Sequence, residues 1–281
     1  MDKALIVINE QSGGYTADIK ERIAAAAKGY QSRYADIDCD LAALLDEGGY
    51  ALLVVAGGDG TLRSVLNKIG DKTIDVWYVP CGTLNERAKA RRRLGGGQKL
   101  VVGEVNGQVY TYVLAAGSFT PIGYVTSVRA KKRLGRLAYL SKVLSEYKVH
   151  RIPATVTVDG QKEAGEYTLI MSIKCDRCFG FGFNRLYTPE DIGGHVLLIK
   201  SPKRGGLGGK IAIFFPFFRA FFLGFGKPYR SNNMLFAPYS AMRIDLKDAC
   251  DFDVDGEKIT LEGTVDLSFA EYPNKFEVLK P

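Results

Sequence analysis

The glycine-rich run Gly57-Gly58-Asp59-Gly60-Thr61 holds the residues best suited to chemistry. Glycine permits positive φ angles and lets a ligand approach the backbone without meeting a Cβ atom. The N–H groups that open a helix lack intrahelical partners, and the helix dipole adds partial positive charge there. A glycine turn at the start of a helix is therefore suited to bind phosphate through its backbone. The alternative is an ordinary turn in which Asp59 or Thr61 only caps the helix.

The flanking residues supply the strand and the helix that such a turn requires. Residues 51–56 form an apolar run with the length of a buried strand, and apolar residues recur at helical spacing through 62–69. The pattern repeats at 75–79, where an apolar strand leads into Pro80-Cys81-Gly82-Thr83. Both Gly-Thr turns thus follow the carboxyl ends of predicted strands, where α/β sheets bind ligands.

Strands and helices alternate from the amino terminus to a predicted hinge at Gly95-Gly96-Gly97. Further strands are expected at 3–9 and 34–38, and helices at 16–28 (capped by Thr16), 41–47 and 84–94. Short loops between alternating elements predict a parallel sheet covered on both faces. We therefore expect a doubly wound α/β domain over residues 1–96.

After the hinge the pattern becomes that of antiparallel strands. Asn106-Gly107 and Asp159-Gly160 are strong hairpin signals within alternating apolar and polar residues. The other expected strands are 195–200, 241–247, 252–261, 264–270 and 276–279, and one helix is expected over 122–147. This pattern predicts an antiparallel β-sandwich over residues 97–281. Whether the last strand returns to the first domain is left open.

Composition narrows the class of protein. The 281 residues are 46% hydrophobic and 25% charged, which is typical of a globular chain, and the net charge of +7 favours an anionic partner. Five cysteines, with no secretory signal pattern at the start, predict reduced thiols in the cytoplasm. Cys175 and Cys178 form a single CxxC, which we interpret as two loop thiols rather than a zinc site. With only two histidines, the expected general base is a carboxylate.

Two familiar nucleotide motifs are excluded by spacing. A dinucleotide fingerprint beginning at Gly58 would need a third glycine where Arg63 stands. The glycine cluster at 205–209 resembles a P-loop in composition only, because Arg204 and Ile211 occupy its first glycine and its Ser/Thr positions. We expect that cluster to be a flexible loop.

Taken together, the motifs resemble the diacylglycerol kinase catalytic-domain family, which includes sphingosine and ceramide kinases and bacterial lipid kinases. The glycine run at 57–61 is similar to its nucleotide-binding signature, which NAD kinases and phosphofructokinases share more distantly. The other matching segments are Asn9 with Ser12-Gly13-Gly14, residues 80–86, Leu134-Gly135 through Tyr139, and Asp255-Gly256-Glu257. The resemblance covers nearly the whole chain. It implies an NAD kinase/phosphofructokinase-like first domain and a β-sandwich that binds lipid.

The resemblance also implies roles, with ATP as phosphoryl donor and Mg²⁺ as cofactor. Nucleotide-binding residues would be Asn9, Ser12, Gly13, Gly57, Gly58, Gly60, Thr61, Gly82, Thr83, Asn85 and Glu86. Catalytic residues would be Asp59, which orients the nucleotide or its magnesium, and Asp255 or Glu257 as the base. Asp59 and Glu86 would be the metal ligands.

Three positions depart from the family's pattern. Glu10 stands where the family has proline, and Glu86 stands where it has aspartate. Gly193 occupies the place of an aspartate that helps to bind an accessory magnesium, and Asp191 comes two residues early. That accessory site is therefore in doubt.

Two segments could bring such an enzyme to lipid. Residues 211–223 are apolar but too short to span a bilayer, so they form either a kinked buried helix or a surface for acyl chains or the membrane interface. A basic cluster comprises Arg129, Lys131, Lys132, Arg133 and Arg136. This cluster is either a solvated helix face or a site that attracts anionic lipid.

We therefore expect a cytoplasmic, peripherally membrane-associated, ATP-dependent kinase that phosphorylates a hydroxyl of diacylglycerol or of a sphingoid lipid such as ceramide. The alternatives are an NAD kinase-like enzyme with a soluble substrate and a non-catalytic lipid- or nucleotide-binding paralogue. Nucleic acid is not an expected partner, since no base-reading module is recognised. The lipid acceptor and homodimer formation stay open.

Overall fold

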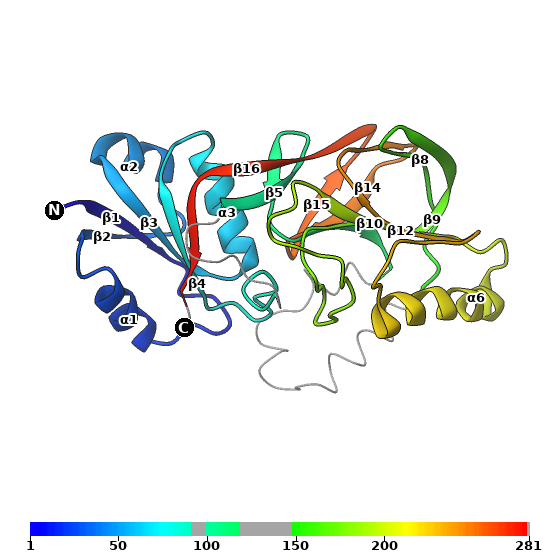
Figure 1. The fold of residues 1–281 in the computed structure, drawn as a ribbon, viewed down its shortest axis with the longest axis horizontal. Helices are drawn as coiled ribbons and strands as arrows, with labels where there is room; N and C mark the ends of the chain where they lie inside the picture. The colour runs from blue at the N-terminus through cyan, green and yellow to red at the C-terminus, as the bar shows by residue number, and fades with distance from the viewer. Residues whose placement is uncertain (91–98, 119–147, 280–281) are drawn as a thin grey trace.

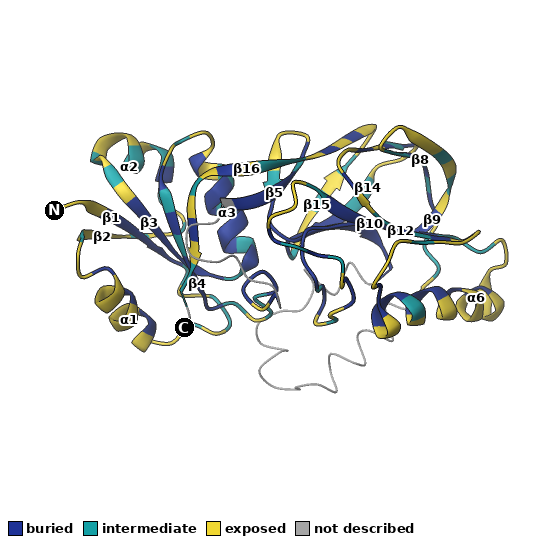
Figure 2. Ribbon diagram, in the orientation of Figure 1, coloured by how far each residue is buried: buried dark blue, intermediate teal, exposed yellow. Residues whose placement is uncertain are grey.

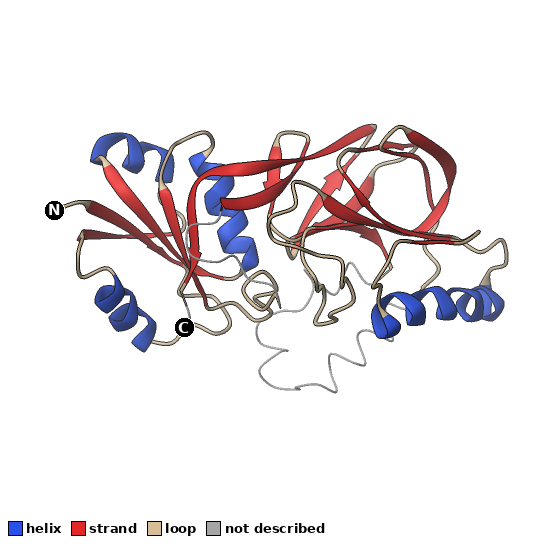
Figure 3. Ribbon diagram, viewed as in Figure 1, coloured by secondary structure: helices blue, strands red, loops and turns tan. Residues whose placement is uncertain are grey.

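The structure is a computed structural model that describes residues 1–90, 99–118 and 148–279. Two halves lie along the longest axis, one a sheet flanked by helices and the other almost entirely strands (Figures 1 and 3). The predicted combination of a parallel α/β part and a β-rich part is confirmed. The predicted hinge at Gly95-Gly96-Gly97 lies outside the described residues, as do the predicted helix over 122–147 and its basic cluster.

The amino-terminal half is a parallel sheet in the order β16-β4-β3-β1-β2. Its strands are β1 (Lys3–Ile8), β2 (Gln31–Asp36), β3 (Tyr50–Gly57), β4 (Asp75–Pro80) and the end of β16 (Thr264–Val278). Helix α1 (Asp18–Ala26) packs on one face, and α2 (Leu41–Gly48) and α3 (Asp59–Ile69) pack on the other. Successive apolar side chains of β1 and β3 alternate between the two cores, which explains why these strands are buried on both faces.

Two predictions in this half are wrong in detail. Helix α1 begins at Asp18, and its N-cap is Ala17 rather than Thr16. Residues 84–90 form turns instead of the start of a helix. The backbone N–H groups of Glu86 and Arg87 donate to the carboxylate of Asp59, which holds this segment in turns.

The β-rich half is an antiparallel sandwich. Its described strands are β5 (Lys99–Val105), β6 (Gln108–Tyr110), β7 (Val113–Gly117), β8 (Ile152–Val158), β9 (Gln161–Ile173), β10 (Gly194–Lys200), β11 (Tyr229–Arg230), β12 (Met234–Tyr239), β13 (Met242–Leu246), β14 (Cys250–Val254) and β15 (Glu257–Leu261), with β16. Both predicted hairpins are present, as β5–β6 and β8–β9. The expected strand 252–261 is divided at Asp255-Gly256 into β14 and β15, because both residues adopt positive φ angles.

A second core covers the outer face of the sandwich. On β9, Leu169, Met171 and Ile173 face this outer core, whereas Ile170 faces the core between the sheets. The outer core is closed by helix α6 (Gly206–Phe218), which continues as a π-helix over Arg219–Leu223. The glycine cluster at 205–209, predicted as a loop, is thus the beginning of a helix.

Strand β16 joins the halves. Its first part pairs antiparallel with β13 and β5, and its last residues, Phe276–Val278, pair parallel with β4. The two strands expected at 264–270 and 276–279 are therefore one strand. The chain end returns to the amino-terminal sheet, as the red ribbon beside β4 shows (Figure 1).

Candidate functional site

The glycine turns meet at the carboxyl ends of β1, β3 and β4. The chain passes from β1 to β2 on one side and then to β3 on the other, so the strand order reverses between β1 and β3. Open α/β sheets bind ligands at such a reversal, outside the carboxyl ends of the strands. The predicted nucleotide site therefore lies where the topology favours one.

Backbone hydrogen bonds join the three turns. Cys81 N donates to Gly57 O at 2.8 Å, and Gly14 N donates to Cys81 O at 2.9 Å. The turns at 57–61 and 80–83 touch through glycines, since a Cβ atom on Gly82 would lie 2.4 Å from the Cα of Gly58. Only glycine fits at position 82 without moving the neighbouring turn.

Side chains of the predicted nucleotide-binding set fasten these turns from within. Asn9 Nδ2 donates to Thr61 Oγ1 at 2.9 Å, and Asn85 Nδ2 donates to Gly82 O at 3.0 Å. Ser12 and Gly13 are partly buried, whereas Thr83 is exposed and free to meet a ligand from solvent. The structure thus brings together the residues that the motifs predicted. It also shows that the side chains of Asn9 and Asn85 hold the turns in place through hydrogen bonds.

Asp59 lies at the first turn of α3 and is almost fully buried. Its Oδ2 accepts from Glu86 N at 2.8 Å, and its Oδ1 accepts from Arg87 N at 3.1 Å. Burial, together with the negative charge of Asp255, raises the pKa of Asp59 to about 7. Asp59 therefore ties the two glycine turns together.

The hairpin between β14 and β15 places the other two predicted acids differently. Asp255 is buried and accepts from Thr111 N, Thr111 Oγ1, Tyr112 N and Val113 N, so both of its oxygens are occupied. Burial still raises its pKa. Asp255 thereby anchors the hairpin tip to the 111–113 segment.

Glu257, in contrast, has a side chain that is 51% exposed, and it reaches the glycine turn. Its Oε1 lies 3.1 Å from the position that a Cβ atom on Gly60 would occupy. Its Oε2 accepts from Arg63 Nη1 at 2.8 Å. Of the two candidate bases, only Glu257 presents a carboxylate toward solvent beside the glycine turn that is predicted to bind phosphate.

Glu86, the other predicted metal ligand, is buried with both oxygens engaged. Oε2 accepts from Arg177 Nε at 2.5 Å, and Oε1 accepts from Gly180 N. Asp59 and Glu86 are thus both buried, and all four of their carboxylate oxygens already accept hydrogen bonds, so they do not form an open magnesium site. The described residues contain no group of three or more potential ligands.

A buried lysine lies beside Asp191, in the region where the resemblance implied an accessory magnesium. Lys174 is buried, and its Nζ donates to the carbonyl oxygen of Asp191 while lying 5.9 Å from the ring centre of Tyr187. Burial and the nearby guanidinium of Arg87 lower the pKa of Lys174 to about 8. Cys175 and Cys178 are buried thiols that form no disulfide, and burial raises the pKa of each.

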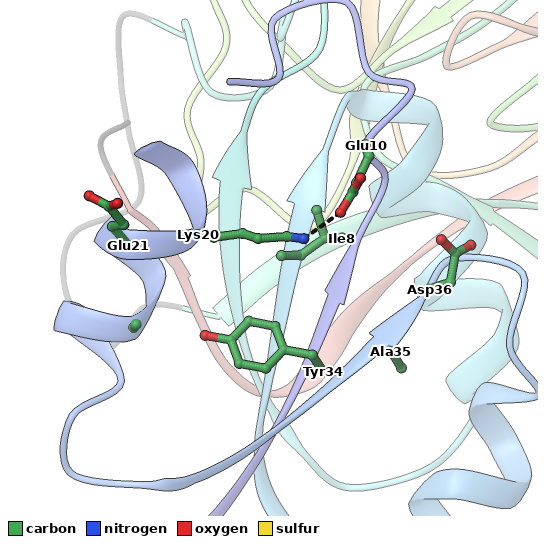
Figure 4. Close-up of a pocket in the computed structure, with 8 residues that line it drawn as sticks. Ile8, Glu10, Lys20, Glu21, Tyr34, Ala35 and Asp36 are labelled. Atoms are coloured by element: carbon green, nitrogen blue, oxygen red, sulfur yellow. Dashed lines mark ion pairs between the residues drawn. The ribbon is translucent and has the colours of Figure 1, made fainter. Parts of the chain in front are cut away.

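A cavity of about 550 Å³ opens between α1 and the ends of β1 and β2, beside the place where the strand order reverses (Figure 4). It is lined by Ile8, Glu10, Lys20, Glu21, Ala24, Tyr34, Ala35 and Asp36. Figure 4 shows Lys20 reaching across to Glu10, with which it forms an ion pair at 2.5 Å, and the exposed ring of Tyr34 below it. An aromatic ring beside carboxylates can hold a base and a ribose.

Sequence reasoning missed two arginines of the site. Arg63 was noted only as a departure from the dinucleotide fingerprint, yet it is buried and connects α3 to Glu257 and to Gln108 at 3.2 Å. Arg87 is buried against Tyr187, and its Nη2 has no hydrogen-bond partner among the described residues. In the sequence, only the position of these arginines next to the two glycine turns indicates that they belong to the site.

Comparisons with known proteins show what the chain resembles. The family model of the diacylglycerol kinase catalytic domain matches residues 3–105. A diacylglycerol kinase of Staphylococcus carnosus (strain TM300) is 29% identical over 137 residues, a match that spans 43% of this chain and 45% of that protein. The diacylglycerol kinase of Bacillus subtilis (strain 168) is 24% identical over 225 residues, covering 74% and 71% of the two chains.

Two further similarities also extend over most of the chain. A probable YegS-like lipid kinase of Pseudomonas aeruginosa (strain PAO1) is 28% identical over 226 residues, covering 73% of this chain and 70% of that protein. The crystal structure of a putative diacylglycerol kinase from Bacillus anthracis (strain Sterne) superposes with a TM-score of 0.72 at 17% identity and covers 98% of this chain and 97% of that one, which shows the shared fold. Residues 3–105 of the chain therefore match the diacylglycerol kinase catalytic domain, and the chain is similar to bacterial lipid kinases over 73–74% of its length.

Proposed function

We propose that the protein transfers the γ-phosphoryl group of ATP to a hydroxyl group of a diacylglycerol or of a sphingoid lipid such as ceramide. The observation that carries the proposal is the position of Glu257, whose carboxylate lies beside Gly60. A phosphate-binding turn and a solvent-facing carboxylate thus meet where an acceptor hydroxyl could approach the phosphate.

The backbone of the glycine turns would bind the phosphates. The N–H groups at the start of α3 are directed toward the carboxyl ends of the strands, and Thr83 adds an exposed hydroxyl. The adenosine would occupy the cavity of Figure 4, where Glu10 or Asp36 can accept from the ribose and Tyr34 can stack on the base.

Glu257 would orient the acceptor hydroxyl and take its proton as the phosphoryl group is transferred. In phosphoryl transfer, positioning and charge stabilisation supply most of the acceleration, so a modest base is sufficient. The ion pair with Arg63 fixes one oxygen of Glu257 and leaves Oε1 toward Gly60. Magnesium held by the triphosphate and water would neutralise phosphate charge.

The proposal is tested with Glu257→Gln, which keeps the shape of the side chain and removes its charge. We expect turnover on dioctanoylglycerol or ceramide in mixed micelles to fall by about 10²–10⁴-fold, the usual range for a general base. ATP binding, measured by calorimetry with magnesium present, should be retained. The matched control is Glu262→Gln, an exposed glutamate just after β15, which should remain fully active.

Two results would contradict the proposal. Full activity of Glu257→Gln would remove it as the base. Phosphorylation of NAD, with none of diacylglycerol, ceramide or sphingosine, would instead identify the NAD kinase-like alternative.

A further inference from the structure

The outer face of α6 is the most apolar exposed surface of the described residues. Seven of the ten exposed large hydrophobic side chains lie on it. We define the α6 outer face by these seven residues, Leu207, Ile211, Phe214, Phe215, Phe218, Phe222 and Leu223. Figure 2 shows this helix at the end of the β-rich half with exposed residues on its outward side. A contiguous apolar surface of this kind marks an interaction site.

The helix presents this face rigidly. On its inner side Ile213, Phe217, Ala220 and Phe221 belong to the outer core of the sandwich. On its outer side the rings of Phe214, Phe218 and Phe222 stack in sequence, at centroid distances of 5.8 and 5.4 Å. The exposed aromatic rings are therefore held in place by a buried face and do not collapse inward.

Along the chain, the segment that carries the helix holds charges of one sign. Residues 192–244 contain eight lysines and arginines and no aspartate or glutamate. Four of these cations are exposed and flank or lie on the helix: Lys203, Arg204, Lys210 and Lys227. Basic side chains around an apolar face complement a surface that is apolar within and anionic at its boundary, as an anionic bilayer is.

The helix begins five residues before the apolar run 211–223, and the whole segment Gly206–Leu223 is long and apolar enough to cross a membrane by length and composition. Its inner side chains, however, pack in the protein core. A helix with one face held by the sandwich can insert only the other face, so it would lie in the plane of the interface.

We propose that the α6 outer face docks the protein on anionic lipid bilayers, with Phe215 and Phe222 inserted below the headgroups and the flanking cations at the lipid phosphates. A second copy of the chain is a poorer occupant, because a symmetric contact would bring the same cations together. Docking goes beyond the proposed function and its measurement does not require catalysis.

The binding test uses co-sedimentation of the full chain with phosphatidylcholine vesicles containing 30% phosphatidylglycerol. Phe215 and Phe222 are 68% and 66% exposed, so replacing both by serine spares the core. Phe215→Ser with Phe222→Ser should lower the vesicle partition coefficient at least tenfold. The matched control is Ile192→Ser, a side chain 61% exposed in the loop before β10, which should bind as the parent does.

A charge series tests the electrostatic part. Lys203→Gln, Arg204→Gln and Lys227→Gln together should weaken binding to anionic vesicles by about 100-fold at low salt, since each basic residue near an anionic surface contributes about fivefold. The control triple variant, Lys3→Gln with Lys28→Gln and Lys247→Gln, removes the same charge from exposed positions elsewhere. Equal loss in both triples would show that net charge alone matters and would overturn docking through α6.

Two more measurements separate the remaining outcomes. Size-exclusion chromatography with light scattering would overturn the proposal if the parent is a dimer, does not bind vesicles, and becomes a monomer in the phenylalanine double variant. Activity gives an independent comparison. The rate on dihexanoylglycerol held in vesicles, divided by the rate on monomeric dihexanoylglycerol in solution, should fall in the phenylalanine double variant. If no lipid is phosphorylated but the vesicle results hold, the proposed function fails and the docking surface stands.

Discussion

At the residue scale, the site combines acids that share a sequence neighbourhood but not an environment. Asp253 and Asp255 are buried, whereas Glu257, two residues further on, is half-exposed. Asp255 is compensated by four hydrogen bonds from the 111–113 segment, whereas Oδ2 of Asp253 has no partner among the described residues. Asp253 and Asp255 are therefore structural acids, and Glu257 is the accessible carboxylate of the three.

Asp253 leads to a prediction about pH. Burial raises its pKa from 3.8 to about 7. Between these values the folded state holds a proton that the unfolded state has lost, so stability falls as pH rises from about 4 to 7 and then levels off. Asp253→Asn keeps the oxygen that accepts from Gly256 N but cannot ionise. The variant should be more stable than the parent at pH 8 by about 1–3 kcal/mol, since a tenfold change in proton affinity corresponds to about 1.4 kcal/mol.

Urea denaturation at pH 5 and pH 8 measures this effect, and the advantage of the variant should shrink at the lower pH. Asp251→Asn is the comparison on the same strand. Its hydrogen bond and ion pair with Lys258 lower the pKa of Asp251, so this variant should be slightly less stable than the parent at neutral pH. A parent whose stability rises steadily from pH 5 to pH 8, with no gain in Asp253→Asn, would show that Asp253 is not protonated in the fold.

At the element scale, the site depends on contact between two turns. Gly82 lies against Gly58, and an added Cβ atom would come within 2.4 Å of the Gly58 Cα and 2.7 Å of Asn85 Oδ1. Backbone atoms cannot be displaced as a flexible side chain can. The separation of the turns at 57–61 and 80–83 is therefore set by the absence of side chains.

Gly82→Ala should consequently push the turns apart. We expect ATP affinity to fall by at least tenfold, because the phosphate-binding N–H groups lose their mutual arrangement, and stability to fall by about 1–3 kcal/mol from overpacking. Gly29→Ala is the control, since a Cβ atom there meets nothing within 4 Å. Calorimetric titration with ATP and thermal unfolding of both variants check this, and unchanged affinity in Gly82→Ala would contradict the role of the contact.

At the scale of the whole molecule, β16 makes the two halves one structural unit. It leaves the sandwich after pairing with β5 and ends beside β4, where Phe276 is buried and its ring stacks 6.4 Å from that of Tyr78. The same arrangement brings the 255–257 hairpin to the glycine turn, since β15 and β16 are consecutive. The site is therefore assembled from segments about 200 residues apart in the sequence. The pairing of β16 with β4 holds these segments together.

Phe276→Ala should destabilise the amino-terminal half by about 3–5 kcal/mol, as expected for a buried phenylalanine. The single tryptophan, Trp77, pairs in register with Glu277 and reports directly on this edge of the sheet. Its fluorescence should change at a lower urea concentration in Phe276→Ala than in Glu277→Ala, an exposed neighbour. Coincident transitions in the two variants would mean that β16 contributes little to this half.

The sequence by itself determined the elements whose signals are local. Apolar runs predicted β1, β3 and β4, glycine runs predicted the turns that follow β3 and β4, and Asn-Gly and Asp-Gly pairs predicted hairpins. These signals are local because backbone conformational preferences act over a few residues. The motifs also predicted the similarity to diacylglycerol kinases that the family model shows over residues 3–105, and every predicted nucleotide-binding glycine lies close to a strand end of the parallel sheet.

Tertiary structure decided what depends on distant partners. The helix expected to begin at residue 84 is replaced by turns over 84–90, where Asp59, 27 residues away from Glu86, takes up backbone N–H groups of the segment. Asp255 and Glu257 look equivalent in sequence, yet burial against the 111–113 segment fixes one and leaves the other accessible. The aromatic helix α6 divides into a core face and an exposed face only once the sandwich exists to cover one side. Burial and hydrogen bonding are properties of the assembled chain, so no local pattern could assign them.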